Sequence, residues 1–104
     1  MSHLKMLAAR FEAASQHYAV ANGIARNDEW FLLKLQEELG ELTQVWMKWT
    51  GRGRAKGRTP EELRGAVEDE AADVLGHILL LAHRHGLDLD AAIRRKWHFD
   101  PQAG

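Results

Sequence analysis

Apolar residues recur every three or four positions along most of this chain, which is the spacing of one face of an α-helix. The pattern predicts a first helix over about residues 4–21, ended by Asn22-Gly23. A second helix is predicted to begin at Asn27 or Asp28, since either is a good N-cap, and to continue to about residue 49. The apolar face of this second helix would consist of Phe31, Leu35, Leu42, Val45, Trp46 and Trp49.

Two further helices are predicted after a loop that cannot pack. Residues 51–58 read Gly-Arg-Gly-Arg-Ala-Lys-Gly-Arg, and this mixture of glycines and cations predicts a mobile basic loop. Thr59, Pro60 and Glu62 supply an N-cap, an N1 proline and a capping box for the third helix. Gly86 is its expected end, and Asp88 is a suitable cap for a short fourth helix over about residues 89–97. The apolar face of the third helix would consist of Leu63, Val67, Ala71, Val74, Ile78 and Leu81.

Together these elements predict an all-α fold. The alternating, β-branched pattern of strands is missing from the sequence, in which Ala, Leu, Glu, Arg and Lys dominate. The 104 residues are the size of one domain, residues 1–104. A chain this short buries only about 60–70% of its unfolded surface. We therefore expect a helical bundle that is completed by oligomerisation.

Composition excludes several classes of function. The absence of cysteine excludes disulfides, thiolate zinc sites and a cysteine nucleophile. A net charge of −1 provides no global field that would favour nucleic acid or an anionic membrane as a partner. The longest strongly apolar run, residues 78–82, is far too short to cross a bilayer, and charged residues interrupt the first twenty positions, so no leader is predicted. The expected location is cytoplasmic.

Two pairs of carboxylates carry the candidate chemistry. Glu38 and Glu41 are three residues apart on the second helix, and Glu70 and Asp73 repeat this spacing on the third. Each pair falls beside the apolar face of its helix, so packing of the two faces should bring four carboxylates together. Such a group is costly unless a cation neutralises it, and Mg²⁺ prefers oxygen ligands. The sequence thus predicts a Mg²⁺ site, with Mn²⁺ as a possible substitute, although either pair alone is more typical of a solvated helix face.

A metal at this position could bind phosphate oxygens and activate a water for attack on phosphorus. Nearby cations would hold the remaining phosphate charge. The candidates are Lys34, Lys48, Arg52, Arg54, Lys56 and Arg58, although the basic loop could also be only a solvated hinge. Trp30 could stack on a nucleobase, but packing is the commoner role of such a residue. His77, one turn after Asp73, could orient a ligand, although a half-buried structural histidine is more usual.

The residues around both pairs resemble a known family. Residues 34–42 read Lys-Leu-Gln-Glu-Glu-Leu-Gly-Glu-Leu, and residues 69–75 read Asp-Glu-Ala-Ala-Asp-Val-Leu. This is similar to the ExxE…ExxD pattern of the MazG family of all-α NTP pyrophosphohydrolases, and residues 85–93 resemble the family's segment after the second motif. The resemblance covers about residues 30–97. It implies Mg²⁺ at Glu38, Glu41, Glu70 and Asp73, hydrolysis of an NTP or dNTP to its monophosphate and pyrophosphate, and assembly as a dimer or tetramer.

Two departures from the family pattern concern substrate recognition. The family often ends with a Lys-x-x-x-Asn-x-x-Arg stretch, of which this chain has only the lysine, Lys96. The linker between the motifs is also long and basic. Neither the nucleobase nor the sugar can therefore be named from the motifs.

Three other functions are alternatives to a house-cleaning NTP pyrophosphohydrolase. The related phosphoribosyl-ATP pyrophosphohydrolase has a similar second motif, including a histidine like His77, but nothing before Lys34 resembles its leading segment. A non-catalytic helical interaction module would use the carboxylates in salt bridges. Nucleic-acid binding through the basic loop is disfavoured, because no recognition helix or stacking platform is evident.

Overall fold

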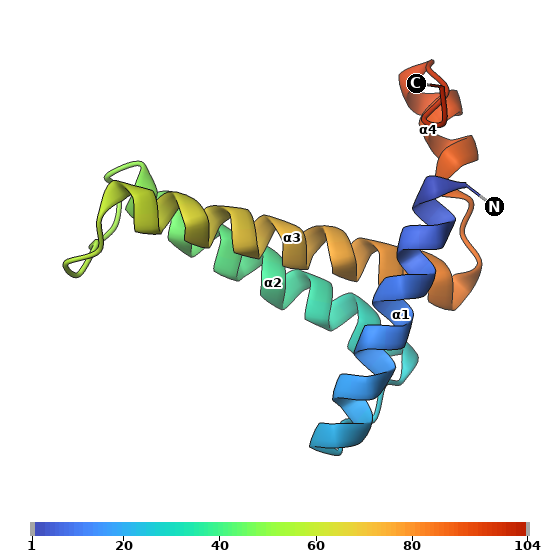
Figure 1. Cartoon of the computed structure of the whole chain (residues 1–104), viewed down its shortest axis with the longest axis horizontal. Coiled ribbons are helices and arrows are strands. Elements are labelled where there is room, and N and C mark those ends of the chain that lie inside the picture. Colours follow the sequence, from blue (N-terminus) through green and yellow to red (C-terminus); the bar gives the residue numbers. More distant parts are fainter. Residues whose placement is uncertain (1, 104) are drawn as a thin grey trace.

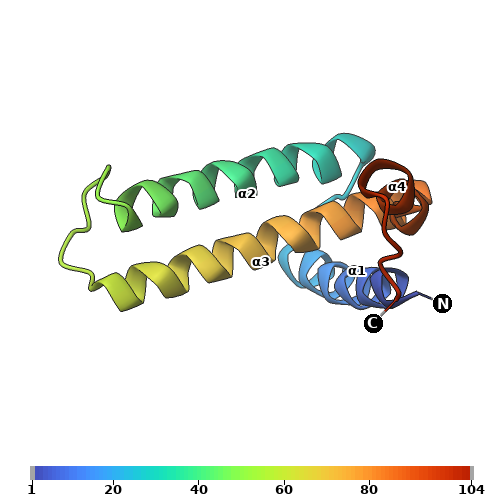
Figure 2. The same ribbon diagram turned by 90° about the horizontal axis from the view of Figure 1, so that it is seen from above.

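The computed structural model describes residues 2–103 and contains four helices and no strand within that range. They are α1 (His3–Asn22), α2 (Asp28–Trp49), α3 (Pro60–His85) and α4 (Leu89–Trp97). α2 and α3 form an antiparallel hairpin, α1 crosses α3 at the end away from the hairpin loop, and α4 extends beyond that crossing (Figures 1 and 2). The predicted all-α class is confirmed. No helix in the described range is both long and apolar enough to span a membrane.

The helices begin and end where local capping signals place them. The Asn27 side chain accepts a hydrogen bond from the backbone N–H of Trp30 at 2.8 Å, which caps α2. Thr59 and Glu62 form the expected capping box at the start of α3, with hydrogen bonds of 3.1 and 2.8 Å. Gly86 ends α3 in the left-handed conformation, with φ of 62°. These three predictions are confirmed.

The core lies where α1 crosses the hairpin. Phe31 and Leu79 are the most completely buried large side chains, with 1% and 2% of their surface exposed. The close approach of α1 to α3 requires Gly76, because a Cβ at that position would lie 2.7 Å from a ring carbon of Phe11. The remaining buried apolar side chains of residues 2–103 are Ala8, Ala19, Leu63, Leu80 and Ala82.

The predicted apolar face of α3 is wrong in part. Ile78 is 39% exposed and Ala71 is also exposed, whereas Leu79, Leu80 and Ala82 are buried. The reason is that α3 packs against two helices, α2 and α1, and therefore buries a second side that the single predicted face did not include. On α2, Trp46 and Trp49 are each 42% exposed within this chain, although the predicted apolar face includes both.

Two arginines hold the α1–α2 connection against the core. Arg26 pairs with Glu12 of α1 through N–H···O contacts of 2.7 and 3.0 Å. Its guanidinium carbon lies 5.1 Å from the ring centroid of Phe31, and that of Arg84 lies 5.2 Å from the same centroid. Arg84 also pairs with Asp28 at the start of α2, at 2.9 Å. These contacts fix the crossing that positions the first turns of α2.

Candidate metal centre

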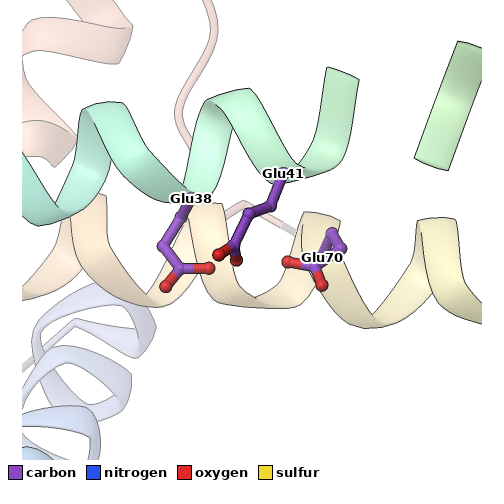
Figure 3. Close-up of side chains that lie close together, drawn as sticks. All are labelled: Glu38, Glu41 and Glu70. Carbon is purple, nitrogen blue, oxygen red and sulfur yellow. The ribbon is translucent and has the colours of Figure 1, made fainter. Parts of the chain in front are cut away.

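Three carboxylates meet between the two long helices. Glu38 and Glu41 reach from α2 towards Glu70 on α3, and one oxygen of each lies within 4.8 Å of the others (Figure 3). We refer to these three residues as the carboxylate cluster. The spacing of three residues puts Glu38 and Glu41 on the same side of α2, and the antiparallel packing of the hairpin brings Glu70 opposite them.

The cluster lies at the border of the core rather than in open solvent. Glu38 is 7% exposed, and Glu41 and Glu70 are half-buried. One oxygen of Glu38 and one of Glu70 (Oε2 in each case) are buried without a hydrogen-bond partner in the described part of the chain. Buried carboxylate oxygens are costly unless a donor or a cation satisfies them, so both oxygens remain available as ligands.

Burial and mutual repulsion make the cluster a strong proton acceptor. The pKa of Glu38 is raised to about 7, chiefly by burial and next by its neighbour Glu41. Asp73 adds to this rise, whereas Lys34 opposes it. The pKa of Glu70 is also raised, first by burial and then by the Glu41 and Asp73 carboxylates. A divalent cation would offset the effects of both burial and repulsion by supplying positive charge beside the carboxylates.

The donor set fits a hard divalent cation. Carboxylate oxygens are the ligands that Mg²⁺ takes, together with waters and phosphate oxygens. Ligands on opposite sides of a Mg²⁺ ion lie roughly 4.2 Å apart, so the 4.8 Å limit on the cluster is within reach of small side-chain rotations. Cysteine is absent and no described histidine belongs to the cluster, which disfavours the softer zinc-type sites.

The fourth predicted ligand lies close by but is not part of the cluster. Asp73 is exposed on α3, one turn after Glu70, and its carboxylate still influences the pKa values of Glu38 and Glu70. It faces a pocket of about 240 Å³ between α1, α2 and α3, which we call the side pocket. The residues of the side pocket that bear on function are Phe11, Tyr18, Trp30, Lys34, Asp73 and His77.

Lys34 lies between the side pocket and the carboxylate cluster. Its Nζ atom lies 3.8 Å from Glu38 Oε1 and 3.4 Å from Glu37 Oε2, and its side chain is half-exposed. It also lines the side pocket. Of the cations that the sequence suggested, Lys34 is therefore the one that the structure brings to the carboxylates.

Trp30 and His77 form an aromatic wall of the side pocket. Their ring centroids are 6.0 Å apart, and Trp30 also packs edge-on against Phe31 at 5.0 Å. The Nδ1 atom of His77 is buried without a partner within residues 2–103. The pKa of His77 is lowered, first by burial and then by Lys34, so its imidazole is neutral at pH 7. A neutral imidazole in such a pocket can donate or accept a hydrogen bond.

The other predicted cations lie away from the cluster. Lys48 is half-buried near the end of α2, and the loop of residues 51–58 lies at the far end of the hairpin (Figures 1 and 2). Arg52 packs its guanidinium over Trp46, at 5.2 Å from the ring centroid, while Lys96 is exposed on α4 at the opposite end of the molecule. The predicted cations that are absent from the side pocket are Lys48, Arg52, Arg54, Lys56, Arg58 and Lys96.

α1 contributes aromatic residues to the side pocket that the sequence pattern did not predict. Phe11 and Tyr18 lie on one side of α1 and line the side pocket together with Lys34. Their helical spacing indicated that this side would pack, yet it gave no sign of which helix would receive it.

No protein-family model, no curated protein and no solved structure matches this chain.

Proposed function

We propose that this chain is a Mg²⁺-dependent nucleoside triphosphate pyrophosphohydrolase, which converts an NTP or dNTP and water into the monophosphate and pyrophosphate. The main support is the carboxylate cluster, in which three carboxyl groups from two helices converge and two buried oxygens lack partners in the described range. That arrangement is unfavourable for a purely structural salt-bridge network, because Lys34 is the one cation of residues 2–103 that pairs with it. The resemblance of both motifs to the MazG family supports the same reaction.

Glu38, Glu41 and Glu70 would hold the metal in this proposal. Asp73, on the next turn of α3, would complete the set by a modest rotation of its side chain or by accepting a hydrogen bond from a bound water. When bound, Mg²⁺ supplies positive charge at the phosphate oxygens and makes water more acidic. The residues of the chain set the position of this chemistry, because the helices that carry them are fixed by the capping and packing described above.

Lys34 and the side pocket would bind the rest of the nucleotide. The Lys34 ammonium is a flexible donor beside the cluster and is suited to a phosphate oxygen that the metal does not neutralise. The side pocket adjoins Lys34 and offers the Trp30 ring and the neutral His77 imidazole, which are suited to a nucleobase or sugar. The cluster and Lys34 would thus hold the phosphates, and the adjoining side pocket would hold the sugar or the base.

The active form would be a homo-oligomer, either a dimer or a tetramer. The outer sides of α2 and α3 expose several large apolar residues, which are Leu32, Leu33, Leu39, Trp46, Trp49 and Leu75. Because the loop cations do not line the side pocket of their own chain, they would reach phosphates only in the site of a neighbouring copy.

Phosphoribosyl-ATP hydrolysis is the second candidate reaction. The position of His77 in the side pocket favours it, because the second motif of that enzyme carries a histidine in a similar place. Both reactions break the bond between the α and β phosphates, so they differ in the substrate rather than in the proposed role of the carboxylates.

A pyrophosphate-release screen across NTPs, dNTPs and phosphoribosyl-ATP, with and without Mg²⁺, tests the proposal. We expect hydrolysis only with the metal and a drop of at least about 100-fold in kcat for Glu70→Gln. Glu68→Gln removes the same charge two residues away on an exposed position of α3 and should leave the rate unchanged. Release of inorganic phosphate and a diphosphate would exclude the proposed bond cleavage. A folded chain that neither hydrolyses nucleotides nor melts at a higher temperature with Mg²⁺ would instead be an interaction module.

A further inference from the structure

A second pocket lies at the other end of α1, away from the carboxylate cluster. It has a volume of about 320 Å³ and forms where the first turns of α1, the last turns of α3 and the start of α4 meet. We call it the end pocket. It shares no lining residue with the side pocket. Its apolar walls include Leu4, Ala8, Leu79, Ala82 and Leu89.

Asp90 gives this apolar pocket a buried charge. The residue is 4% exposed and belongs to the pocket lining. Its Oδ2 atom accepts a hydrogen bond from the Ser2 hydroxyl at 2.7 Å, and Ser2 in turn accepts one from the backbone N–H of Lys5 at 3.1 Å. The carboxyl group is thereby held in one orientation. Its second oxygen, Oδ1, is buried and has no hydrogen-bond partner in the part of the chain that the structure describes.

No described residue of the chain compensates this oxygen. The N-terminus of α4 favours a negative charge at its second residue, but this field supplies no hydrogen bond to Oδ1. Lys5 lines the pocket but forms no ion pair with a carboxylate within residues 2–103. Asp88, which caps α4 at 3.0 Å from the backbone N–H of Ala91, adds a second negative charge at the rim. The remaining titratable group of the lining, His83, is exposed.

We propose that the end pocket binds a small primary amine in its protonated form. The ammonium group would donate a hydrogen bond to Asp90 Oδ1, and a compact apolar body would lie against the leucine and alanine walls. The volume is at the lower end of the range for ligand pockets, which are mostly apolar with a few placed polar groups. A cation satisfies both the hydrogen bond and the buried charge, whereas a neutral donor satisfies only the first.

Calorimetric titration of the full chain at pH 7 with 2-phenylethylamine and isopentylamine tests this site. The corresponding alcohols, 2-phenylethanol and isopentanol, match the two amines in shape without the charge. We expect saturable binding of at least one amine. The affinity for the corresponding alcohol should be at least about tenfold lower. Asp90→Asn should lower the amine affinity by about tenfold or more, because the Asn side chain keeps an acceptor for Ser2 but carries no charge. Glu61→Gln, the same charge change in the first turn of α3 and outside the pocket, should have no effect.

A second variant keeps the test decisive if Asp90→Asn does not fold. Ala9 lines the pocket but is exposed, so Ala9→Leu should fold and narrow the pocket without changing its charge. This substitution should lower the affinity for the amine several-fold. Three outcomes would overturn the proposal: no saturable amine binding to the natural chain, equal affinity for amine and alcohol, or amine binding that appears only in Lys5→Gln. The last result would show that Lys5 itself occupies the place of the amine.

Discussion

The two ends of the α2–α3 hairpin differ in what covers them. At the end away from the loop, α1 crosses α3, and Phe31 and Leu79 are almost completely buried. Towards the loop of residues 51–58, Leu63 is the one large apolar residue that is fully buried among those described, and Trp46 and Trp49 are each 42% exposed. The carboxylate cluster lies between these ends, in the middle of α2 and α3. α1 crosses the hairpin at only one end, which leaves the other end without a covering helix in the described part of this chain.

The cations of the two ends are also used differently. Near the crossing, Arg26 and Arg84 each pair with a carboxylate and pack against Phe31. In the loop, Arg54, Lys56 and Arg58 form no ion pair with any described residue. The first group therefore stabilises the fold, while the second remains free to bind an anion.

Truncating one large side chain at each end of the hairpin should give the largest difference in the free energy of unfolding. Phe31→Ala is expected to lower the free energy of unfolding by about 3–5 kcal/mol, because the ring is buried on all sides. Trp49→Ala should cost less than about 1 kcal/mol in a monomer, since its ring is partly in water. Urea unfolding at two protein concentrations measures both. If Trp49→Ala is costly and its effect grows with protein concentration, the loop end is an oligomer interface.

The cluster between the ends should make stability depend on pH. Because the pKa of Glu38 rises from 4.5 in the unfolded chain to about 7 in the folded one, the folded state holds more protons between these values. The free energy of unfolding should then fall as the pH rises from about 4.5 to about 7, by at most about 3 kcal/mol. Urea unfolding in the presence of EDTA would record this fall.

Two comparisons identify the source of that pH dependence. Glu38→Gln should flatten the profile, whereas Glu68→Gln should keep it. Saturating Mg²⁺ at pH 8 should raise stability in the natural chain, because the proposed metal would bind the folded cluster and not the unfolded chain. A profile that stays flat in the natural chain would mean that the three carboxylates are separated in solution.

Replacing two glycines of α3 by alanine should change stability in opposite directions at the two ends, by smaller amounts. Gly76→Ala should lower stability by about 1–2 kcal/mol, because overlap with the Phe11 ring outweighs the better helix propensity of alanine. Gly65→Ala, towards the loop, meets no atom within 4 Å and should raise stability by up to about 1 kcal/mol. Thermal unfolding of both variants would measure these changes in stability. If Gly76→Ala is as stable as Gly65→Ala, α1 does not cross α3 as closely as described.

Neutralising the loop should have the smallest effect on stability and a moderate one on catalysis. Replacement of Arg52, Arg54, Lys56 and Arg58 by glutamine should raise KM several-fold and change kcat less, as expected for cations that bind ground and transition states alike. Steady-state kinetics at two salt concentrations would show this. An unchanged KM would indicate that the loop is only a hinge. If Lys34→Gln alone raises KM while the loop variant does not, the phosphate contact belongs to α2.

The positions of the helices could be predicted because their signals are local. Asn27, Thr59 and Gly86 act on backbone groups within a few residues, so their effect does not depend on the rest of the fold. The convergence of Glu38, Glu41 and Glu70 followed from helical spacing and one packing assumption. Periodicity does not say which helix meets which side, and this is why the exposure of Ile78 was missed.

Other features depend on residues that are distant in the sequence. Asp73 stays outside the cluster because its position on α3 turns it towards the pocket that α1 closes. The burial of Asp90 depends on Ser2, at the opposite end of the described chain. Neither relation leaves a trace in the local pattern of hydrophobic and polar residues.

The Ser2–Asp90 hydrogen bond has a consequence for the order in which the molecule assembles. The α2–α3 hairpin closes a loop of about ten residues, an event of roughly 10–100 ns, whereas Ser2 and Asp90 are 88 positions apart. The entropy lost on closure grows with the length of the segment enclosed, so this bond should form after the hairpin and open before it. Amide protons in the first turns of α1 and α4 would then exchange with solvent faster than those in the middle of α3. The carboxylates would be assembled first, and the end pocket would be the last part of the molecule to take shape.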